Sequence, residues 1–207
     1  MSSLIKSTIK VDNLTIKQGD KTLWRNLSFC LQSGDRLGIS APSGFGKSTL
    51  GRVIAHWQKV SSGSILLDGN VISTKGYCPI QLVNQHPERS FNPYRTLQAS
   101  LYDAWNPAPC WFDKLSIKST WLARRPSELS GGELARIALL RALDPRTQFL
   151  IVDEATAQLD AYIQAKIWQI LIDESVKRPL GMLIFSHNKT LLQKVCTNIL
   201  YFDAARD

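Results

Sequence analysis

Short apolar runs alternate with polar and glycine-containing turns along most of the chain. Apolar and polar positions alternate over Ile9 to Leu14 and Leu27 to Leu31, which predicts two strands joined across a turn at residues 18–21. Other runs predict strands at Arg36 to Ser40, Ile65 to Leu67, Leu82 to Val83, Phe149 to Val152 and Met182 to Phe185, and helices at Lys47 to Trp57, Leu129 to Leu143 and Ala161 to Ser175. This alternation favours an α/β fold with a mostly parallel sheet, preceded by a small N-terminal antiparallel β layer. Such folds bind ligands at the carboxyl ends of their strands.

Residues 86–126 differ from the rest of the chain. The segment is interrupted by Pro87, Pro93, Pro107 and Pro109, and it carries large aromatic side chains at Trp105, Trp111, Phe112 and Trp121. We expect a largely helical subdomain, about residues 86–143, inserted into a single domain that spans residues 1–207. The aromatic side chains either fill the core of this subdomain or form an exposed interaction patch. In the second case, the docking surface lies around Phe91 to Leu101.

The composition limits the class of protein. A chain of 207 residues, 44% hydrophobic and 20% charged, supports one sizeable core. Its 25 Lys and Arg exceed its 17 Asp and Glu by 8, a surplus that suits nucleotides, nucleic acid or an anionic membrane face without choosing among them. No apolar run approaches the roughly 18 residues of a membrane helix, and residues 1–12 lack a signal-peptide core, so we expect a soluble chain that is not secreted. The four cysteines lack zinc-type spacing and are expected to be reduced, buried thiols.

A glycine-rich run lies between the strand predicted at residues 36–40 and the helix that follows. Residues 41–49 match the phosphate-loop pattern GxxxxGK[ST], except that Ala41 stands where the pattern has Gly. In such a loop, backbone N–H groups surround the β-phosphate, Lys47 reaches phosphate oxygens and Ser48 supplies an oxygen to Mg²⁺. A positive φ at Ala41 would cost about 1 kcal/mol. The expected ATP site contains Ser43, Gly44, Phe45, Gly46, Lys47, Ser48 and Thr49; a glycine-rich turn without a ligand is the alternative.

Further polar groups follow the later predicted strands. The strand at residues 149–152 runs into Asp153 and Glu154, and two acids at a buried strand end need a cation or a catalytic role to be tolerated. Gln85 follows an earlier strand and His187 a later one. Residues 129–133 read Leu-Ser-Gly-Gly-Glu, a pattern that by itself is equally typical of a helix N-cap.

In this order, the motifs resemble those of the nucleotide-binding subunit of an ATP-binding cassette (ABC) transporter, over nearly the whole chain. The resemblance implies that Asp153 holds Mg²⁺, that Glu154 polarises the attacking water, and that His187 bonds the γ-phosphate. Gln85 would contact Mg²⁺ and the same water. A signature turn consisting of Ser130, Gly131, Gly132 and Glu133 would contact ATP held by a second subunit.

The sequence departs from the family pattern at several positions. No aromatic residue lies near Gln18 to stack on adenine, and Trp24 is some residues away. Glu133 stands where the signature usually has Gln, while Ala155 and Asn188 replace the usual Pro and Asp. The loop Thr156 to Asp160 resembles an intersubunit contact, although Asp160 is equally explained as a helix N-cap. His56 and His86 match no family position and are expected to be structural.

Residues 85–97, with the run Ser90-Phe91-Asn92-Pro93, resemble more narrowly the branch that imports peptides and nickel or metal chelates. That resemblance implies the second, shorter ATPase subunit of an importer at the cytoplasmic face of the membrane. Its partners would be another cassette subunit, two permeases and a substrate-binding protein, with no nucleic acid. The alternative is a soluble ABC ATPase that acts on ribosomes or DNA. Such proteins usually carry a second cassette or a long coiled-coil insertion, and 207 residues leave no room for either.

Overall fold

Two sheets form the centre of the computed structural model, which describes residues 6–73 and 75–202. The first is antiparallel, with strand order β2-β1-β4-β5. It comprises β1 (Thr8–Gln18), β2 (Lys21–Gln32), β4 (Ser62–Leu67) and β5 (Asn70–Val71). Buried positions such as Ile9 and Val11 alternate with exposed ones along β1 because one face of the sheet is covered. This sheet is the predicted N-terminal β layer, and its strands are longer than the predicted apolar runs.

The second sheet is parallel, with strand order β6-β7-β8-β3-β9. Its strands are β3 (Arg36–Ser40), β6 (Ile80–Val83), β7 (Phe149–Asp153), β8 (Gly181–Phe185) and β9 (Asn198–Tyr201). Every residue of β7 and β8 is buried, which explains why both strands are continuous apolar runs. The predicted fold class, a P-loop α/β fold with one parallel and one antiparallel sheet, is confirmed.

Two hydrophobic clusters lie on opposite faces of the parallel sheet. Phe149 and Ile151 of β7 belong to the cluster shared with the antiparallel sheet and α1 (Lys47–Ile54). Leu150 and Val152 belong to the other cluster, which is shared with the helices. Alternate residues of β7 therefore pack against different layers of the molecule. One layer is the antiparallel sheet with α1, and the other is formed by the helices.

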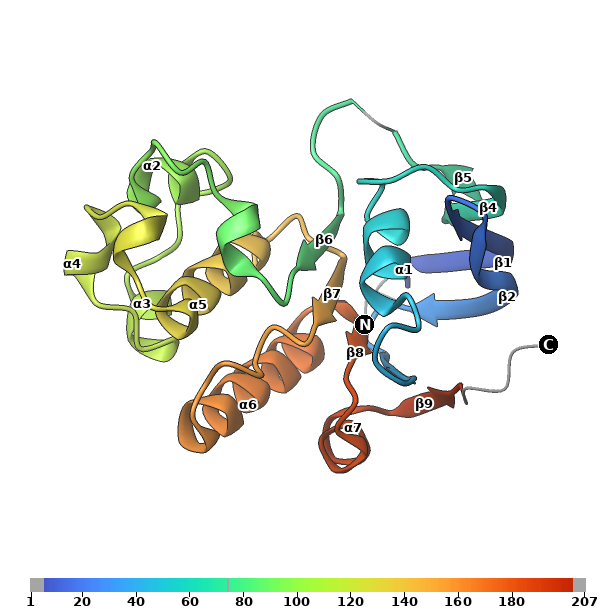
Figure 1. Ribbon diagram of the computed structural model, residues 1–207. Helices are drawn as coiled ribbons and strands as arrows, with labels where there is room; N and C mark the ends of the chain where they lie inside the picture. Colours follow the sequence, from blue (N-terminus) through green and yellow to red (C-terminus); the bar gives the residue numbers. More distant parts are fainter. Residues whose placement is uncertain (1–5, 74, 203–207) are drawn as a thin grey trace.

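Helices cover the second face of the parallel sheet (Figure 1). They are α5 (Gly131–Ala142), α6 (Ala161–Lys177) and α7 (Lys189–Val195). Each starts at a polar N-cap whose side chain accepts a backbone N–H three residues later, namely Ser130, Asp160 and Asn188. The N-cap interpretation of Asp160 is thus confirmed.

Short helices between β6 and α5 lie on the opposite side of the molecule from the antiparallel sheet (Figure 1). They are η1 (Pro87–Ser90), α2 (Leu97–Tyr102), α3 (Cys110–Lys114), α4 (Ser119–Leu122) and η2 (Pro126–Glu128). Trp121 is buried, and Trp105, Trp111 and Phe112 pack against the same core. Trp121 therefore lies in the core of the helical segment and the other three aromatic side chains lie half-buried against it, while the division of this segment from the rest as a subdomain stays a prediction.

The docking surface expected around Phe91 to Leu101 stays a prediction, but the large aliphatic side chains of this segment are not exposed. Phe91, Leu97 and Leu101 are buried, because they belong to the same hydrophobic cluster as the apolar residues of α5. Tyr94, by contrast, is 83% exposed. The accessible part of this segment is polar, with one exposed aromatic ring.

Several other boundaries and exposures differ from the sequence-based predictions. Helix α1 ends at Ile54 rather than Trp57, because His56 adopts a left-handed conformation with φ of 60°. Strand β9 and helix α7 were not predicted. Of the four thiols expected to be buried, Cys30 and Cys110 are exposed.

Candidate functional site

The phosphate loop follows β3 directly and ends where α1 begins. Gly44 and Gly46 have φ of 74° and 94°, a left-handed backbone that glycine adopts without a steric penalty. Ala41 is not among the described non-glycine residues with positive φ, so it carries none of the strain considered above. A cavity of about 300 Å³ lies over the loop, lined by Ser43, Gly44, Gly46, Lys47, Ser48, Thr49, Gln18, Leu23, Gln85, Asp153 and Glu154.

Lys47 is held inside this loop although it is a charged residue. Its Nζ donates hydrogen bonds to the carbonyl oxygens of Ala41 at 2.7 Å and Pro42 at 3.1 Å. Glu154 Oε1 lies 4.0 Å away. Because the side chain is only 7% exposed, these oxygens compensate for the loss of hydration and fix the ammonium beside the cavity.

Trp24 supports the phosphate loop from the protein core and is not placed to stack on an adenine ring. Its Nε1 donates to the carbonyl of Gly46 at 3.0 Å, and its ring makes edge contacts with Phe45 and Phe202. The ring is 4% exposed and sits in the core. Phe45, expected in the ATP site, directs its ring into this aromatic cluster and is not among the cavity-lining residues.

Asp153 and Ser48 offer oxygen ligands of the kind that Mg²⁺ prefers. Asp153 is 2% exposed, and burial raises the pKa of its carboxyl, while a hydrogen bond with Ser48 opposes the rise. A cation beside these oxygens would balance the buried negative charge. The residues present therefore fit a magnesium ion.

Glu154 is where the predicted catalytic groups converge. His187 Nδ1 lies 3.0 Å from Glu154 Oε1, and Gln85 Nε2 donates to Glu154 Oε2 at 3.4 Å. The three residues follow β7, β8 and β6, which are neighbours in the parallel sheet. Glu154 itself has φ of 48°, an uncommon conformation that is retained where the surrounding structure fixes it.

The predicted signature turn forms a separate cavity of about 340 Å³, lined by Ser130, Gly131, Gly132, Glu133, Arg136, Gln158, Leu159, Asp160 and Ile163. Glu133 Oε2 accepts the backbone N–H and the hydroxyl of Ser130, at 2.9 and 3.0 Å. This capping box fixes the start of α5, and the Ser130 N–H lowers the pKa of Glu133. Ser130 is therefore the N-cap of α5.

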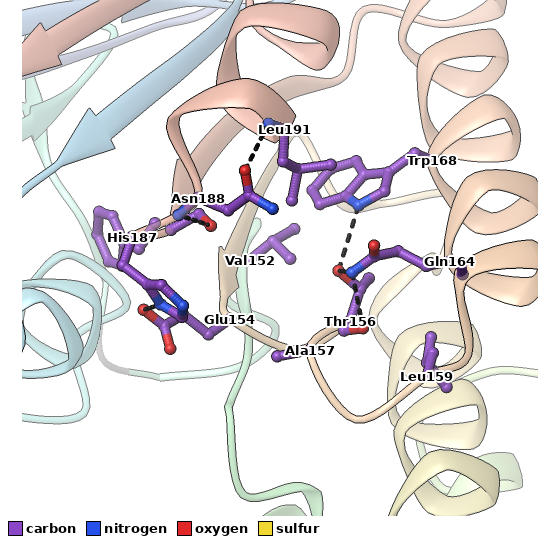
Figure 2. Close-up of a pocket in the computed structure, with 13 residues that line it drawn as sticks. Val152, Glu154, Thr156, Ala157, Leu159, Gln164, Trp168, His187, Asn188 and Leu191 are labelled. Carbon is purple, nitrogen blue, oxygen red and sulfur yellow. Dashed lines mark hydrogen bonds and ion pairs between the residues drawn. The ribbon is translucent and has the colours of Figure 1, made fainter.

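Side chains of α6 hold the loop that follows Glu154 by hydrogen bonds to Thr156. Gln164 Nε2 donates to the carbonyl and hydroxyl of Thr156, at 3.0 and 3.2 Å, and Trp168 Nε1 donates to the same hydroxyl at 3.2 Å. These groups line a pocket of about 300 Å³, whose lining also includes Leu159 and Leu191. Figure 2 shows these side chains around the pocket. The sequence alone does not identify Gln164 and Trp168 as site residues, because a glutamine in a helix is typical of a solvated face and a tryptophan is typical of a buried one.

The arrangement of these groups around the parallel sheet is characteristic of one class of fold. A phosphate loop joins β3 to α1, two acids end β7, and a glutamine and a histidine face them from adjacent strands. These features define a P-loop nucleoside triphosphatase fold. Within the described residues, no helix is long and apolar enough to cross a membrane.

Comparison with known proteins identifies the family. The family described as "ABC transporter" matches residues 24–157. An Fe(3+) ions import ATP-binding protein, FbpC 1 of Rhodococcus jostii, is 31% identical over 87% of this chain and 55% of its own length. The nickel import system ATP-binding protein NikE of Staphylococcus aureus is 30% identical over 85% of this chain and 78% of its own. The chain belongs to the ABC transporter family and contains its ATPase domain.

Two further comparisons agree with this assignment. The oligopeptide transport ATP-binding protein AppF of Bacillus subtilis is 29% identical over 88% of this chain and 62% of its own length. A post-hydrolysis dimer of the ATP-binding cassette MJ0796 bound to ADP and Pi superposes with a TM-score of 0.80, at 21% identity, over 96% and 97% of the two chains. That structure confirms the fold. The chain spans little more than half the length of the iron-import relatives it matches, 55% and 60%.

Proposed function

We propose that this chain is the ATP-hydrolysing subunit of an ABC importer. The observation that carries the proposal is the convergence of Lys47, Gln85, Asp153, Glu154 and His187 at the carboxyl edge of one parallel sheet, beside a glycine loop. Each group has a chemical task in hydrolysis, because phosphoryl transfer depends on positioning and on stabilising charge. A protein that only binds ATP, without hydrolysing it, would not need Glu154 or His187.

The side chains divide this task by their charge and position. The loop N–H groups and Lys47 bind the phosphates of ATP, with the N-terminus of α1 directed at the same anion. Glu154 is the base that accepts a proton from the attacking water, and Gln85 orients that water from the other side. His187, whose side chain is 63% exposed and lies 3.0 Å from Glu154, bonds the γ-phosphate in this proposal. Mg²⁺, when bound, neutralises phosphate charge beside Ser48 and Asp153.

A second cassette completes the site in this proposal. Ser130, Gly131, Gly132 and Glu133 are expected to contact ATP held by a partner cassette. The capping box supports this because it holds Ser130 and Glu133 in place at the start of α5, where the contact would be made. Two permeases and a substrate-binding protein complete the importer, at the cytoplasmic face of the membrane.

For the cargo, we propose peptides or nickel and other metal chelates. The run Ser90-Phe91-Asn92-Pro93 and the similarity to NikE and AppF support this branch and the second subunit type. The iron-import proteins are comparably similar. Uptake assays with labelled nickel, ferric iron and oligopeptide in a deletion strain would separate the three cargoes.

Two substitutions test the ATPase function. Lys47→Ala should abolish most of the thermal stabilisation by Mg-ATP, because the phosphate-binding ammonium is removed. Glu154→Gln should keep that stabilisation but hydrolyse ATP about 10²–10⁴-fold more slowly, the usual contribution of a general base. Equal stabilisation of wild type and Lys47→Ala would refute nucleotide binding here, and unchanged turnover in Glu154→Gln would refute the base.

The alternative, a soluble ABC ATPase of ribosomes or DNA, predicts a different distribution in the cell. An importer subunit should sediment with membranes only when its permeases are co-expressed. Salt-sensitive sedimentation with ribosomes, in the absence of permeases, would favour the alternative.

A further inference from the structure

Gln158 connects two parts of the site that the catalytic scheme treats separately. Its Nε2 donates a hydrogen bond to the backbone carbonyl of Gln85 at 3.2 Å. Its Oε1 lies so close to Gly131 that a Cβ added there would collide with it. One side chain thus contacts both the Gln85 segment and the signature turn of the same chain.

The backbone that carries Gln158 is well fixed. Thr156, two residues earlier, is buried and held by Gln164 and Trp168 of α6 (Figure 2). The N–H of Leu159 donates to the carbonyl of Thr156 at 3.2 Å, which closes the turn around Gln158. The side chain of Gln158 is therefore directed from a rigid base, although the residue itself is exposed.

Gln85 is contacted at both its main chain and its side chain. Its carbonyl accepts from Gln158, while its amide Nε2 donates to Glu154 Oε2 at 3.4 Å. A shift of the Gln85 backbone would lengthen a side-chain contact that is already near the limit for a hydrogen bond. Contact with Gln158 restrains that shift.

We propose that Gln158 is a positioning residue, which ties the Gln85 segment to the signature turn and so keeps the Gln85 amide at Glu154. This inference rests on the proposed function of Gln85 and Glu154 in hydrolysis. It links, within one chain, the glutamine that serves its own ATP site with the turn that would serve a partner's site. Gln158 itself does not touch the reacting atoms.

Hydrogen exchange on the purified full chain tests the link without a partner protein. Gln158→Ala should increase exchange at the Arg89 amide, which bonds to the His86 carbonyl in the Gln85 segment, and at the Leu134 amide in the first turn of α5. Exchange in β7 should stay unchanged. The matched control is Gln169→Ala on α6, which removes only an exposed hydrogen bond to Asp173. Unchanged exchange at both amides would overturn the proposal.

A double-mutant cycle in ATP hydrolysis tests whether Gln158 acts through Gln85. Gln158→Ala should lower kcat about two- to fivefold without changing KM for ATP, the effect expected for one exposed hydrogen bond. In a Gln85→Ala background, the same substitution should have no further effect on kcat, because the side chain to be positioned is gone. Additive losses would overturn the proposal.

A size-matched variant separates positioning from packing. Gln158→Glu keeps the length of the side chain, but its carboxylate cannot donate to the Gln85 carbonyl, so kcat should fall as in Gln158→Ala. A wild-type rate in Gln158→Glu would refute the hydrogen bond. If wild type hydrolyses ATP and all Gln158 variants match it, this inference fails alone. If wild type binds no nucleotide, the proposed function fails, and the hydrogen-exchange result still decides the link.

Discussion

Single residues with unusual backbone conformations determine where the reactive groups lie. Glu154, with φ of 48°, turns the chain sharply after β7, so its carboxylate faces His187 and Gln85 rather than continuing the strand direction. Its N–H donates to the carbonyl of Phe185 in β8, at 3.2 Å. The conformation is thus fixed by the neighbouring strand, as strained residues at functional sites require.

Glu133 shows how a departure from the family pattern is accommodated. Its carboxylate is bound to Ser130 of its own helix, and the lowered pKa of Glu133 means that it is charged at neutral pH. A glutamine would make the same capping contacts without the charge. The substitution therefore preserves the shape of the signature turn and adds negative charge beside it.

Cysteine reactivity gives a prediction at the scale of one side chain. Burial raises the pKa of Cys196 to about 12, so its thiol is protonated at pH 8, and thiolate is the reactive form. We expect iodoacetamide at pH 8 to alkylate the exposed Cys30 and Cys110 and to leave Cys196 unmodified until the chain is unfolded. Peptide mass spectrometry measures each site, and equal rates for Cys196 in the native and unfolded chains would contradict this prediction.

At the scale of elements, hydrophobic pattern predicted the buried strands well and the exposed edge poorly. Strands β7 and β8 are buried on both faces, so their sequences are unbroken apolar runs. Strand β9 lies at the edge of the sheet, with exposed residues at both ends, and its four residues lack a clear pattern. Edge strands are specified mainly by their one neighbour, which the local sequence does not encode.

Helix α6 supports the site through a buried polar contact, which yields a prediction. Trp168→Phe keeps most of the ring packing but removes the N–H that Thr156 accepts. We expect the free energy of unfolding to fall by about 1–2 kcal/mol in urea denaturation. Trp57→Phe, at a residue that is 53% exposed, is the control and should change it by less than about 0.5 kcal/mol. Equal effects of the two substitutions would mean that the contact is not stabilising.

At the scale of the whole molecule, the order of the motifs along the sequence predicted which catalytic groups come together. It did not predict the individual contacts that support them. Gln85, Glu154 and His187 are distant in sequence but follow adjacent parallel strands, so their meeting could be expected from the strand-end rule. Trp24 and Gln158 could not be identified this way. Their contacts depend on the register of the β1–β2 hairpin and on a loop conformation, both of which arise from tertiary packing.

The exposed part of the segment 91–101 gives a prediction about assembly. Tyr94 is exposed, and Arg95 forms a surface ion pair with Asp103. Tyr94→Ala combined with Arg95→Glu should abolish co-purification with the permeases, because it removes the exposed ring and reverses the local charge, and should leave ATP binding by the isolated chain intact.

Exchanging the charges, as Arg95→Asp with Asp103→Arg, is the control, because it keeps the local ion pair. If the Tyr94 and Arg95 double variant still assembles a transporter that hydrolyses ATP normally, the docking surface lies elsewhere. Loss of ATP binding in that variant would instead indicate damage to the fold.

Strand β3, which carries the phosphate loop, pairs in the parallel sheet with β8 and β9, which come last in sequence among the strands of residues 6–73 and 75–202. During synthesis, residues 36–40 leave the ribosome while residues 181–201 have yet to be translated. Until those residues emerge, β3 lacks both neighbours and the loop has no fixed base. A nascent chain that still lacks residues 181–201 therefore cannot gain stability from ATP, and the unpaired edges of β3 must be protected from aggregation until those residues emerge.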